Sequence, residues 1–150
     1  MKLLIDTQVF IWLLNSDDRL GSKTREILLN KSNELYLSYF SVYEMIIKAS
    51  IGKLNYDPSV LDDLQSMGIE LLVPDKTTLQ NYTLFNPDNK DPFDNAIITM
   101  AIHENCLLVT SDSRILQLSI HNLNLLNAKN NSSISYYAIE GTSLGCNNSK

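Results

Sequence analysis

The sequence predicts an α/β protein of three layers (α/β/α), in which a mainly parallel sheet lies between two layers of helices. Short apolar runs alternate along the chain with segments of helical periodicity, as is typical of parallel strands joined by crossover helices. The runs are apolar almost throughout, as expected for strands that are covered on both faces. The expected strands are residues 2–5, 35–39, 69–73, 106–110 and 123–126.

Helical periodicity fills the segments between these strands, and several helix ends carry recognisable signals. Asp57 and Asp91 each precede a proline, which is the pattern of an N-cap followed by proline at the first helical position. Ser41 and Glu44 have the spacing of a capping box, and Gly52 is expected to end the same helix. The expected helices are residues 8–15, 22–32, 42–52, 58–67, 76–84, 92–104 and 113–119.

The chain of 150 residues is expected to form one domain over residues 1–128, followed by a flexible C-terminal extension over residues 129–150. A domain of this size buries enough apolar surface to fold independently. After residue 128 the periodic pattern is lost and asparagine and serine are frequent, which is typical of a flexible segment.

Charge and composition limit the class of protein. The formal net charge of −5 argues against a passive nucleic-acid-binding protein but not against a nuclease, because active-site acids contribute to this charge. No stretch approaches 18 uncharged apolar residues and no cleavage site follows the apolar start, so we expect neither a membrane span nor a secretion signal. Cys106 and Cys146 are expected to be free thiols, which favours a reducing, cytoplasmic location.

Four acidic residues are expected at one edge of the sheet. Asp6 and Asp112 each end a strand, Glu44 follows the second strand, and Asp94 lies at the start of a helix. The carboxyl ends of parallel strands share one edge, and ligands bind there. Carboxylates about 4 Å apart repel each other by roughly 4 kcal/mol per pair at an effective dielectric near 20. A divalent cation relieves this repulsion, and an all-oxygen site favours Mg²⁺, with Mn²⁺ as a second candidate.

Most of these acids also have a structural interpretation. Glu44 has the spacing for a capping box and for an ion pair with Lys48. Asp94 lies in a first helical turn, where the helix dipole favours an acid, and Asp112 can cap the helix that follows it. Asp6 is the hardest to explain in this way, because it ends a strand, where aspartate is disfavoured.

Four segments resemble, in the correct order, the PIN domain, and most of all its VapC-like toxin branch. They are LLIDTQVFIWLL, LYLSYFSVYEMIIKASIGKL, DPFDNAIITMAI and LLVTSD, and the likeness covers residues 1–127. The resemblance implies a sheet of order 3-2-1-4-5, which places Asp6 beside Asp112 where the strand order reverses. It also implies that Asp6, Glu44 and Asp94 take the family's core acidic positions and that Asp112 takes a fourth, more variable one.

The resemblance implies a Mg²⁺-dependent endoribonuclease that is the toxin of a toxin–antitoxin pair. Asp6, Asp94 and Asp112 are then expected to hold the metal directly or through water, and Glu44 to complete the site or orient the attacking water. The expected partners are RNA, a small antitoxin protein and a second copy of the chain.

Further residues are candidates for supporting roles. Three polar residues beside the acids are expected to orient carboxylates or metal-bound water: Thr7, Thr110 and Ser111. Three lysines are candidates to hold the RNA backbone: Lys23, Lys48 and Lys53. Lysines on helices are more often solvated, so the second assignment has a simple structural alternative.

Two other functional interpretations stay open. Many relatives have His where this chain has Gln8 and Arg where it has Asn95, which makes a catalytically weakened PIN module, acting through partner or RNA binding, an alternative. A receiver-like signalling domain also has an acidic Mg²⁺ pocket in an α/β fold. That class requires a lysine in a late loop, and the only lysines after residue 100 are Lys129 and Lys150, beyond the last expected strand.

Overall fold

The computed structural model describes residues 1–82 and 91–131 of the chain, and five strands in this part form one parallel sheet. The strand order is β3-β2-β1-β4-β5, and each neighbouring pair is parallel. This order confirms the prediction and excludes the receiver-like alternative, because the receiver order 2-1-3-4-5 places the first strand beside the third. The strands are β1 (Lys2–Ile5), β2 (Glu34–Ser38), β3 (Ile69–Leu72), β4 (Leu107–Thr110) and β5 (Asn124–Asn127).

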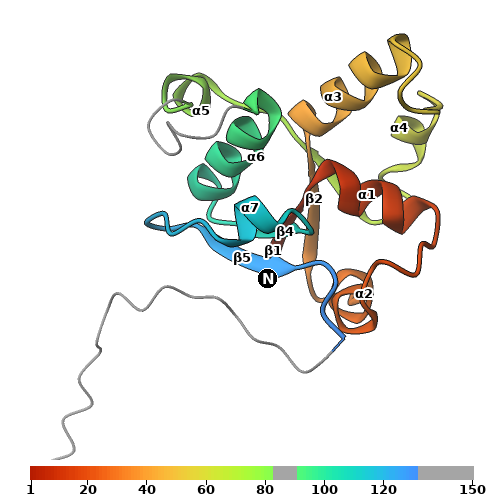
Figure 1. Ribbon diagram of the computed structural model, residues 1–150, viewed down its shortest axis with the longest axis horizontal. Helices are drawn as coiled ribbons and strands as arrows, with labels where there is room; N and C mark the ends of the chain where they lie inside the picture. The colour runs from red at the N-terminus through yellow and green to blue at the C-terminus, as the bar shows by residue number, and fades with distance from the viewer. Residues whose placement is uncertain (83–90, 132–150) are drawn as a thin grey trace, which may run out of the picture.

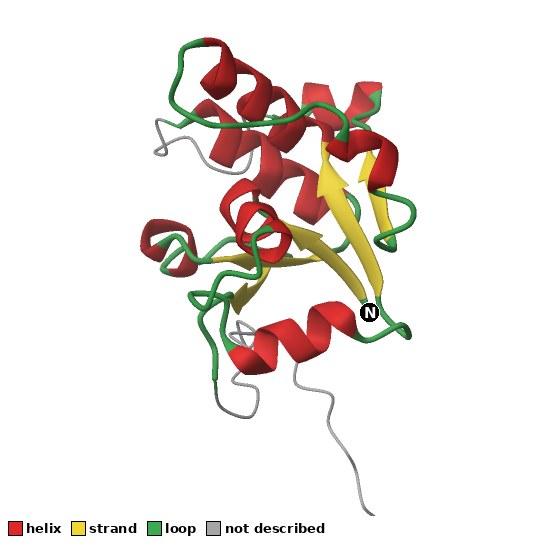
Figure 2. Ribbon diagram, turned by 90° about the vertical axis from the view of Figure 1, so that its right-hand side faces the viewer, coloured by secondary structure: helices red, strands yellow, loops and turns green. Residues whose placement is uncertain are grey.

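Helices cover both faces of the sheet and give the three layers that the sequence predicts. The helices are α1 (Thr7–Leu14), α2 (Ser22–Leu29), α3 (Tyr39–Ser50), α4 (Val60–Asp63), α5 (Lys76–Gln80), α6 (Pro92–His103) and α7 (Ser113–Leu116). Figure 1 shows α6 and α7 on one side of the sheet and α1 and α2 on the other. Figure 2 shows the strands between these helices. Within the described ranges, none of the helices is long and apolar enough to span a membrane.

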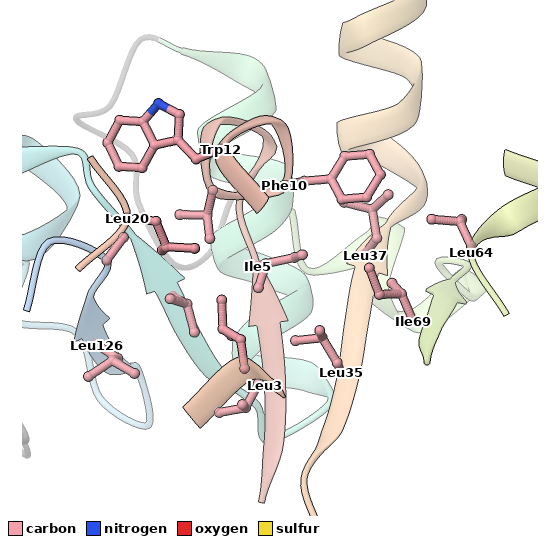
Figure 3. Packing of buried hydrophobic residues seen from close by; sticks show 14 of the residues in the cluster. Leu3, Ile5, Phe10, Trp12, Leu20, Leu35, Leu37, Leu64, Ile69 and Leu126 are labelled. Atoms are coloured by element: carbon pink, nitrogen blue, oxygen red, sulfur yellow. The ribbon is translucent and has the colours of Figure 1, made fainter. Parts of the chain in front are cut away.

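Side chains on both faces of β1 are buried, and each face belongs to a separate apolar cluster. Leu3 and Ile5 face one cluster together with Phe10 and Trp12 of α1 (Figure 3). Leu4 faces the second cluster, to which α6 contributes most of its buried side chains. Complete burial of a side chain of this size contributes about 1.5–3 kcal/mol. The two clusters therefore fix the sheet between its helical layers and determine where its carboxyl edge lies.

Helix α3 begins earlier than the sequence predicts, and the capping-box assignment of Ser41 and Glu44 is wrong. Ser38 is the N-cap, and its hydroxyl oxygen accepts a hydrogen bond from the Phe40 amide at 3.1 Å. The helix therefore starts directly at the end of β2, without a connecting loop. Glu44 lies in the second turn, and Gly52 follows the helix end with a φ of 72°, as expected for a terminating glycine.

Helices α2 and α7 end earlier than the sequence predicts, at Leu29 and Leu116, and α4 and α5 are also shorter than predicted. Asp57 accepts a hydrogen bond from the Ser59 amide at 2.9 Å, which forms a turn, and α4 then covers only four residues. Helix α5 ends at Gln80, and residues 83–84 of its predicted range lie outside the described residues. An aspartate before a proline thus marks a turn at the first of the two predicted positions. It marks a helix start at the second, where Asp91 is the N-cap of α6.

The chain that follows β5 packs against the start of α2. The Gly21 amide donates a hydrogen bond to the Ala128 carbonyl at 2.8 Å, and the Thr24 amide donates to the Asn130 carbonyl at 3.4 Å. Residues 129–131, which the sequence assigns to the flexible extension, therefore contact the domain. The remainder of the extension lies outside the described residues.

Gly21→Ala should destabilise the protein for a steric reason. A Cβ atom at this position would lie 2.3 Å from the Asn130 carbonyl oxygen and 2.6 Å from the carbonyl carbon. These are backbone atoms, so the segment after β5 must move away from α2. We expect the free energy of unfolding to fall on the order of 1–3 kcal/mol, measured by urea denaturation.

Gly52→Asn is the matched control for this experiment. A Cβ atom at Gly52 meets nothing within 4 Å, and asparagine tolerates the left-handed conformation that the φ of 72° requires. Its unfolding free energy should stay within about 0.5 kcal/mol of the wild-type value. Wild-type stability in Gly21→Ala would contradict the packing of the C-terminal segment on α2.

Candidate active site

An acidic cavity of about 510 Å³ lies at the carboxyl edge of the sheet. Residues that follow β1 and β4 line it, at the point where the strand order reverses, together with residues of α1, α3, α6 and α7. Its charged lining consists of five acids and two bases: Asp6, Glu44, Asp91, Asp94, Asp112, Lys48 and Arg114. The structure therefore brings together in one cavity all four acids that the sequence places at this edge.

Asp6 is buried, with 8% of its surface exposed, and its contacts join three elements. Its backbone amide donates a hydrogen bond to the Val109 carbonyl at 3.0 Å, which connects the end of β1 to β4. One carboxylate oxygen caps α1 by accepting from the Val9 amide at 2.7 Å, and the other accepts from the Thr110 hydroxyl at 2.5 Å. The Ser111 backbone amide also donates to this carboxylate. Sequence analysis missed the capping role, because it placed the start of the helix after Thr7.

Burial raises the pKa of Asp6 from an ordinary value of 3.8 to about 6. The hydrogen bonds from Thr110, Val9 and Ser111 act in the opposite direction, because they stabilise the ionised form. The charge of Glu44 raises the pKa further. The ionised carboxylate is thus poorly solvated, and a cation bound beside it would lower its pKa.

Glu44 reaches the cavity from α3, and two neighbours hold its carboxylate. The Thr7 hydroxyl, which also lines the cavity, donates to Oε2 at 2.7 Å. Lys48 Nζ lies 2.5 Å from Oε1, one helical turn along α3. The ion pair that the sequence predicts is therefore present, and the Thr7 hydrogen bond connects α3 to the start of α1.

Besides Asp6, three acids of the cavity lie at helix starts, and two of these three are also N-caps. Asp91 Oδ1 accepts from the Phe93 and Asp94 amides at 2.9 and 3.2 Å, at the start of α6. Asp94 is itself the third residue of that helix. Asp112 Oδ1 accepts from the Arg114 amide at 2.7 Å, at the start of α7. Both caps use Oδ1 alone for these bonds, so capping a helix and lining the cavity are compatible in one residue.

Arg114 is a cavity residue that sequence analysis did not single out. Its Nη2 atom lies 3.0 Å from Asp112 Oδ2 and 3.9 Å from Asp94 Oδ2. The guanidinium holds the pKa of Asp112 below its ordinary value. A sequence signal for this residue exists, because the second residue of a helix follows its capping acid closely enough for the two side chains to meet.

Of the lysines predicted to hold RNA, only Lys48 is among the described residues that line the cavity. Lys23 instead forms an ion pair with Glu26 on α2 at 2.8 Å. Lys53 lies beyond the end of α3 and is not among the lining residues described. Gln8 also lines the cavity.

The donor set of the cavity suits a hard divalent cation, because every acid in it offers oxygen only. In the part of the chain that the structure describes, no group of three or more His, Cys, Asp or Glu side chains is arranged to hold a metal ion. Glu44 is turned toward Lys48. Asp112 is likewise turned toward Arg114. A cation that approached Asp112 would therefore compete with Arg114 for its carboxylate.

Asp6→Asn should change how stability depends on pH. The folded-state pKa of about 6 lies above the ordinary value of 3.8, so the wild-type protein loses stability as the pH rises through this window. The penalty above pH 6 is about 3 kcal/mol, and the amide loses about 1 kcal/mol in hydrogen bonding. In urea denaturation with EDTA, the variant should therefore be more stable than wild type by about 1–2 kcal/mol at pH 7.5. This difference should shrink toward pH 4.

Asp17→Asn is the control, because its carboxylate behaves in the opposite way. The hydrogen bonds and charge of Arg19 lower the pKa of Asp17 to about 2. The contribution of Asp17 to stability is therefore nearly complete at pH 4 and constant above about pH 5, and so is the expected difference between this variant and wild type. A difference for Asp6→Asn that is equally independent of pH would contradict the burial of an ionised Asp6.

Comparison with known proteins identifies the family. The family model for the PIN domain matches residues 3–120. No curated protein matches the sequence. A chain of VapBC2 from Rickettsia felis, solved bound to a DNA fragment from their promoter, is similar in fold, with 19% identity, a TM-score of 0.63 and coverage of 85% of this chain and 98% of that chain. A chain of VapBC-1 from nontypeable Haemophilus influenzae has 22% identity, a TM-score of 0.56 and coverage of 78% and 91%. These two likenesses show the fold, and because the family match spans most of the sequence, this chain belongs to the PIN domain family.

Proposed function

We propose that this protein is a metal-dependent endoribonuclease that cleaves RNA phosphodiesters at the acidic cavity. The observation that carries the proposal is the convergence of Asp6, Glu44, Asp94 and Asp112, which come from four separate parts of the chain and line one cavity. PIN domains are typically nucleases. Repulsion among clustered carboxylates opposes folding, and active sites often carry such a cost in stability.

The proposed roles follow from the contacts of each acid. Asp6, Asp94 and Asp112 would hold Mg²⁺ or Mn²⁺ through oxygen. When bound, the ion lowers the pKa of water and offsets negative charge on the phosphate. Glu44, which the Thr7 hydroxyl holds at 2.7 Å, orients the attacking water and accepts its proton.

Two further residues support this chemistry. The Thr110 hydroxyl bonds to Asp6 at 2.5 Å and keeps the buried carboxylate directed at the cavity. Lys48 lines the cavity, and its ammonium group can hold an RNA phosphate once it leaves Glu44. Contacts to phosphate position the substrate but carry no information about its sequence.

We further infer that the protein is the toxin of a toxin–antitoxin pair and acts on RNA in the cytoplasm. The support is the similarity in fold to chains of two VapBC complexes. The proposed partners are a small antitoxin, whose amphipathic segment covers the acidic cavity, and a second copy of this chain. A PIN module that binds RNA without cleaving it is the second candidate, because Gln8 lines the cavity in place of the His of many relatives.

The purified protein should cleave structured RNA in the presence of Mg²⁺ or Mn²⁺ and lose this activity in EDTA. Asp6→Asn, Glu44→Gln and Asp94→Asn should each reduce the cleavage rate by at least about 10²-fold. Asp112→Asn should have a smaller effect. Asp17→Asn, which removes the same charge outside the cavity, is the control and should cleave like wild type. RNA binding without Mg²⁺-dependent cleavage would favour the second candidate, and full cleavage by Asp6→Asn would contradict the proposed mechanism.

Expression of the wild-type chain should slow the growth of a bacterial host, and the small protein encoded next to it should restore growth. Asp6→Asn should be harmless, because the proposed toxicity requires the acidic cavity. The measurement is growth after induction, with immunoblots to show that both chains accumulate equally. If the inactive variant is as harmful as wild type, the toxin assignment fails, whereas the nuclease assignment depends only on the cleavage assay.

A further inference from the structure

Arg114 is the cavity base that contacts the acids assigned to the metal. Its guanidinium lies 3.0 Å from Asp112 and 3.9 Å from Asp94. The negative charge of Asp91 also acts on it and helps to raise its pKa. These acids come from the starts of α6 and α7, so one side chain connects the two helices. The other base of the described lining, Lys48, is paired with Glu44 on its own helix.

Arg114 and a metal ion would compete for the same carboxylates. Asp94 and Asp112 are two of the three acids that the proposed function assigns to Mg²⁺. A guanidinium and a divalent cation next to the same oxygens repel each other, so binding of one displaces the other. The basic side chain therefore acts as an internal counter-ion in the metal-free protein.

The contacts of Arg114 are easily broken. Its side chain is 75% exposed, and exposed ion pairs contribute little because water screens them and two long side chains must be ordered. The guanidinium is also anchored at a helix of only four residues. Displacement by a divalent cation therefore meets little resistance and leaves the guanidinium at the edge of the cavity.

The released guanidinium is suited to phosphate. Its planar group presents five donors in a fork that matches phosphate oxygens in pairs, which a lysine ammonium cannot do. Arg114 lines the same cavity as the proposed catalytic acids, so a phosphate bound to it would lie next to them.

We propose that Arg114 exchanges partners during the reaction cycle: it neutralises Asp94 and Asp112 in the metal-free protein and holds an RNA phosphate once the metal has taken these acids. The exchange rests on the proposed function. It makes Arg114 a substrate-positioning residue, and its loss should affect metal and RNA in opposite directions.

The experiment compares Arg114→Ala and Arg114→Lys with wild type. Affinity for Mg²⁺ without RNA is measured by titration calorimetry and by the shift in melting temperature, and KM and kcat are measured on one RNA oligonucleotide. Arg114→Ala should bind Mg²⁺ about two- to fivefold more tightly, because its competitor is gone. Its KM should rise about tenfold with little change in kcat, and the salt dependence of RNA binding should weaken by about one phosphate contact. Arg114→Lys should have an intermediate KM.

Arg19→Ala is the matched control. Arg19 is also exposed and also paired with an acid two residues away, but outside the described lining of the cavity. Its Mg²⁺ affinity and KM should equal those of wild type. Unchanged or weaker Mg²⁺ binding by Arg114→Ala would overturn the exchange, and so would tighter Mg²⁺ binding with an unchanged KM. The exchange is tested by the Mg²⁺ affinity and the KM of the variant relative to those of wild type. The proposed function is tested separately, by RNA cleavage by the wild-type protein.

Discussion

The hydrogen bonds of Asp6 join three elements at the carboxyl edge of the sheet. Its amide connects β1 to β4, and its two carboxylate oxygens bind the first turn of α1 and the Thr110 hydroxyl. These contacts hold a carboxylate inside the fold, where burial raises its pKa to about 6. The hydrogen bonds that join β1, β4 and α1 at this edge therefore also hold the ionised Asp6 carboxylate where water solvates it poorly. A bound cation relieves that cost without breaking the bonds, which is why the fold and the chemistry of this cavity depend on the same residue.

Helix capping and ligand binding occur at the same place in this architecture. In a parallel α/β fold the helices start where the strands end, so the N-terminal turns and the ligand-binding edge coincide. Aspartates are favoured at such turns because they accept from free amides and interact well with the helix dipole. Asp91 and Asp112 cap helices through Oδ1 and still line the cavity. A capping signal in the sequence is consequently no argument against a functional role for the same acid.

Apolar runs and the positions of acids near strand ends and helix starts predicted the layers, the five strands and four of the five acids of the cavity. The fifth acid, Asp91, was predicted only as a helix cap, and the family resemblance added the strand order. Periodicity could not locate the start of α3, because Ser38 and Ser41 are both good caps three residues apart. The choice depends on where β2 ends, which pairing with β1 and β3 determines. The pairing of Arg114 with Asp112 is local in sequence, but its contact with Asp94 arises from the approach of α6 to α7. Such an approach between segments distant in sequence leaves no local pattern.

The distribution of charge in the cavity is compatible with the proposed action of an acidic chain on RNA. Five carboxylates and two basic side chains give the described lining a formal charge of −3, and one divalent cation reduces it to −1. Under the proposed exchange the cation would also free Arg114 from the carboxylates, so the positive charge available to a phosphate would increase by more than the ion alone supplies. In the metal-free protein the same bases limit repulsion among the acids, which at an effective dielectric near 20 is roughly 4 kcal/mol for a pair 4 Å apart. Internal counter-ions thus limit repulsion in the metal-free protein, but under the proposed exchange Arg114 would lower the apparent affinity for the ion because it must be displaced.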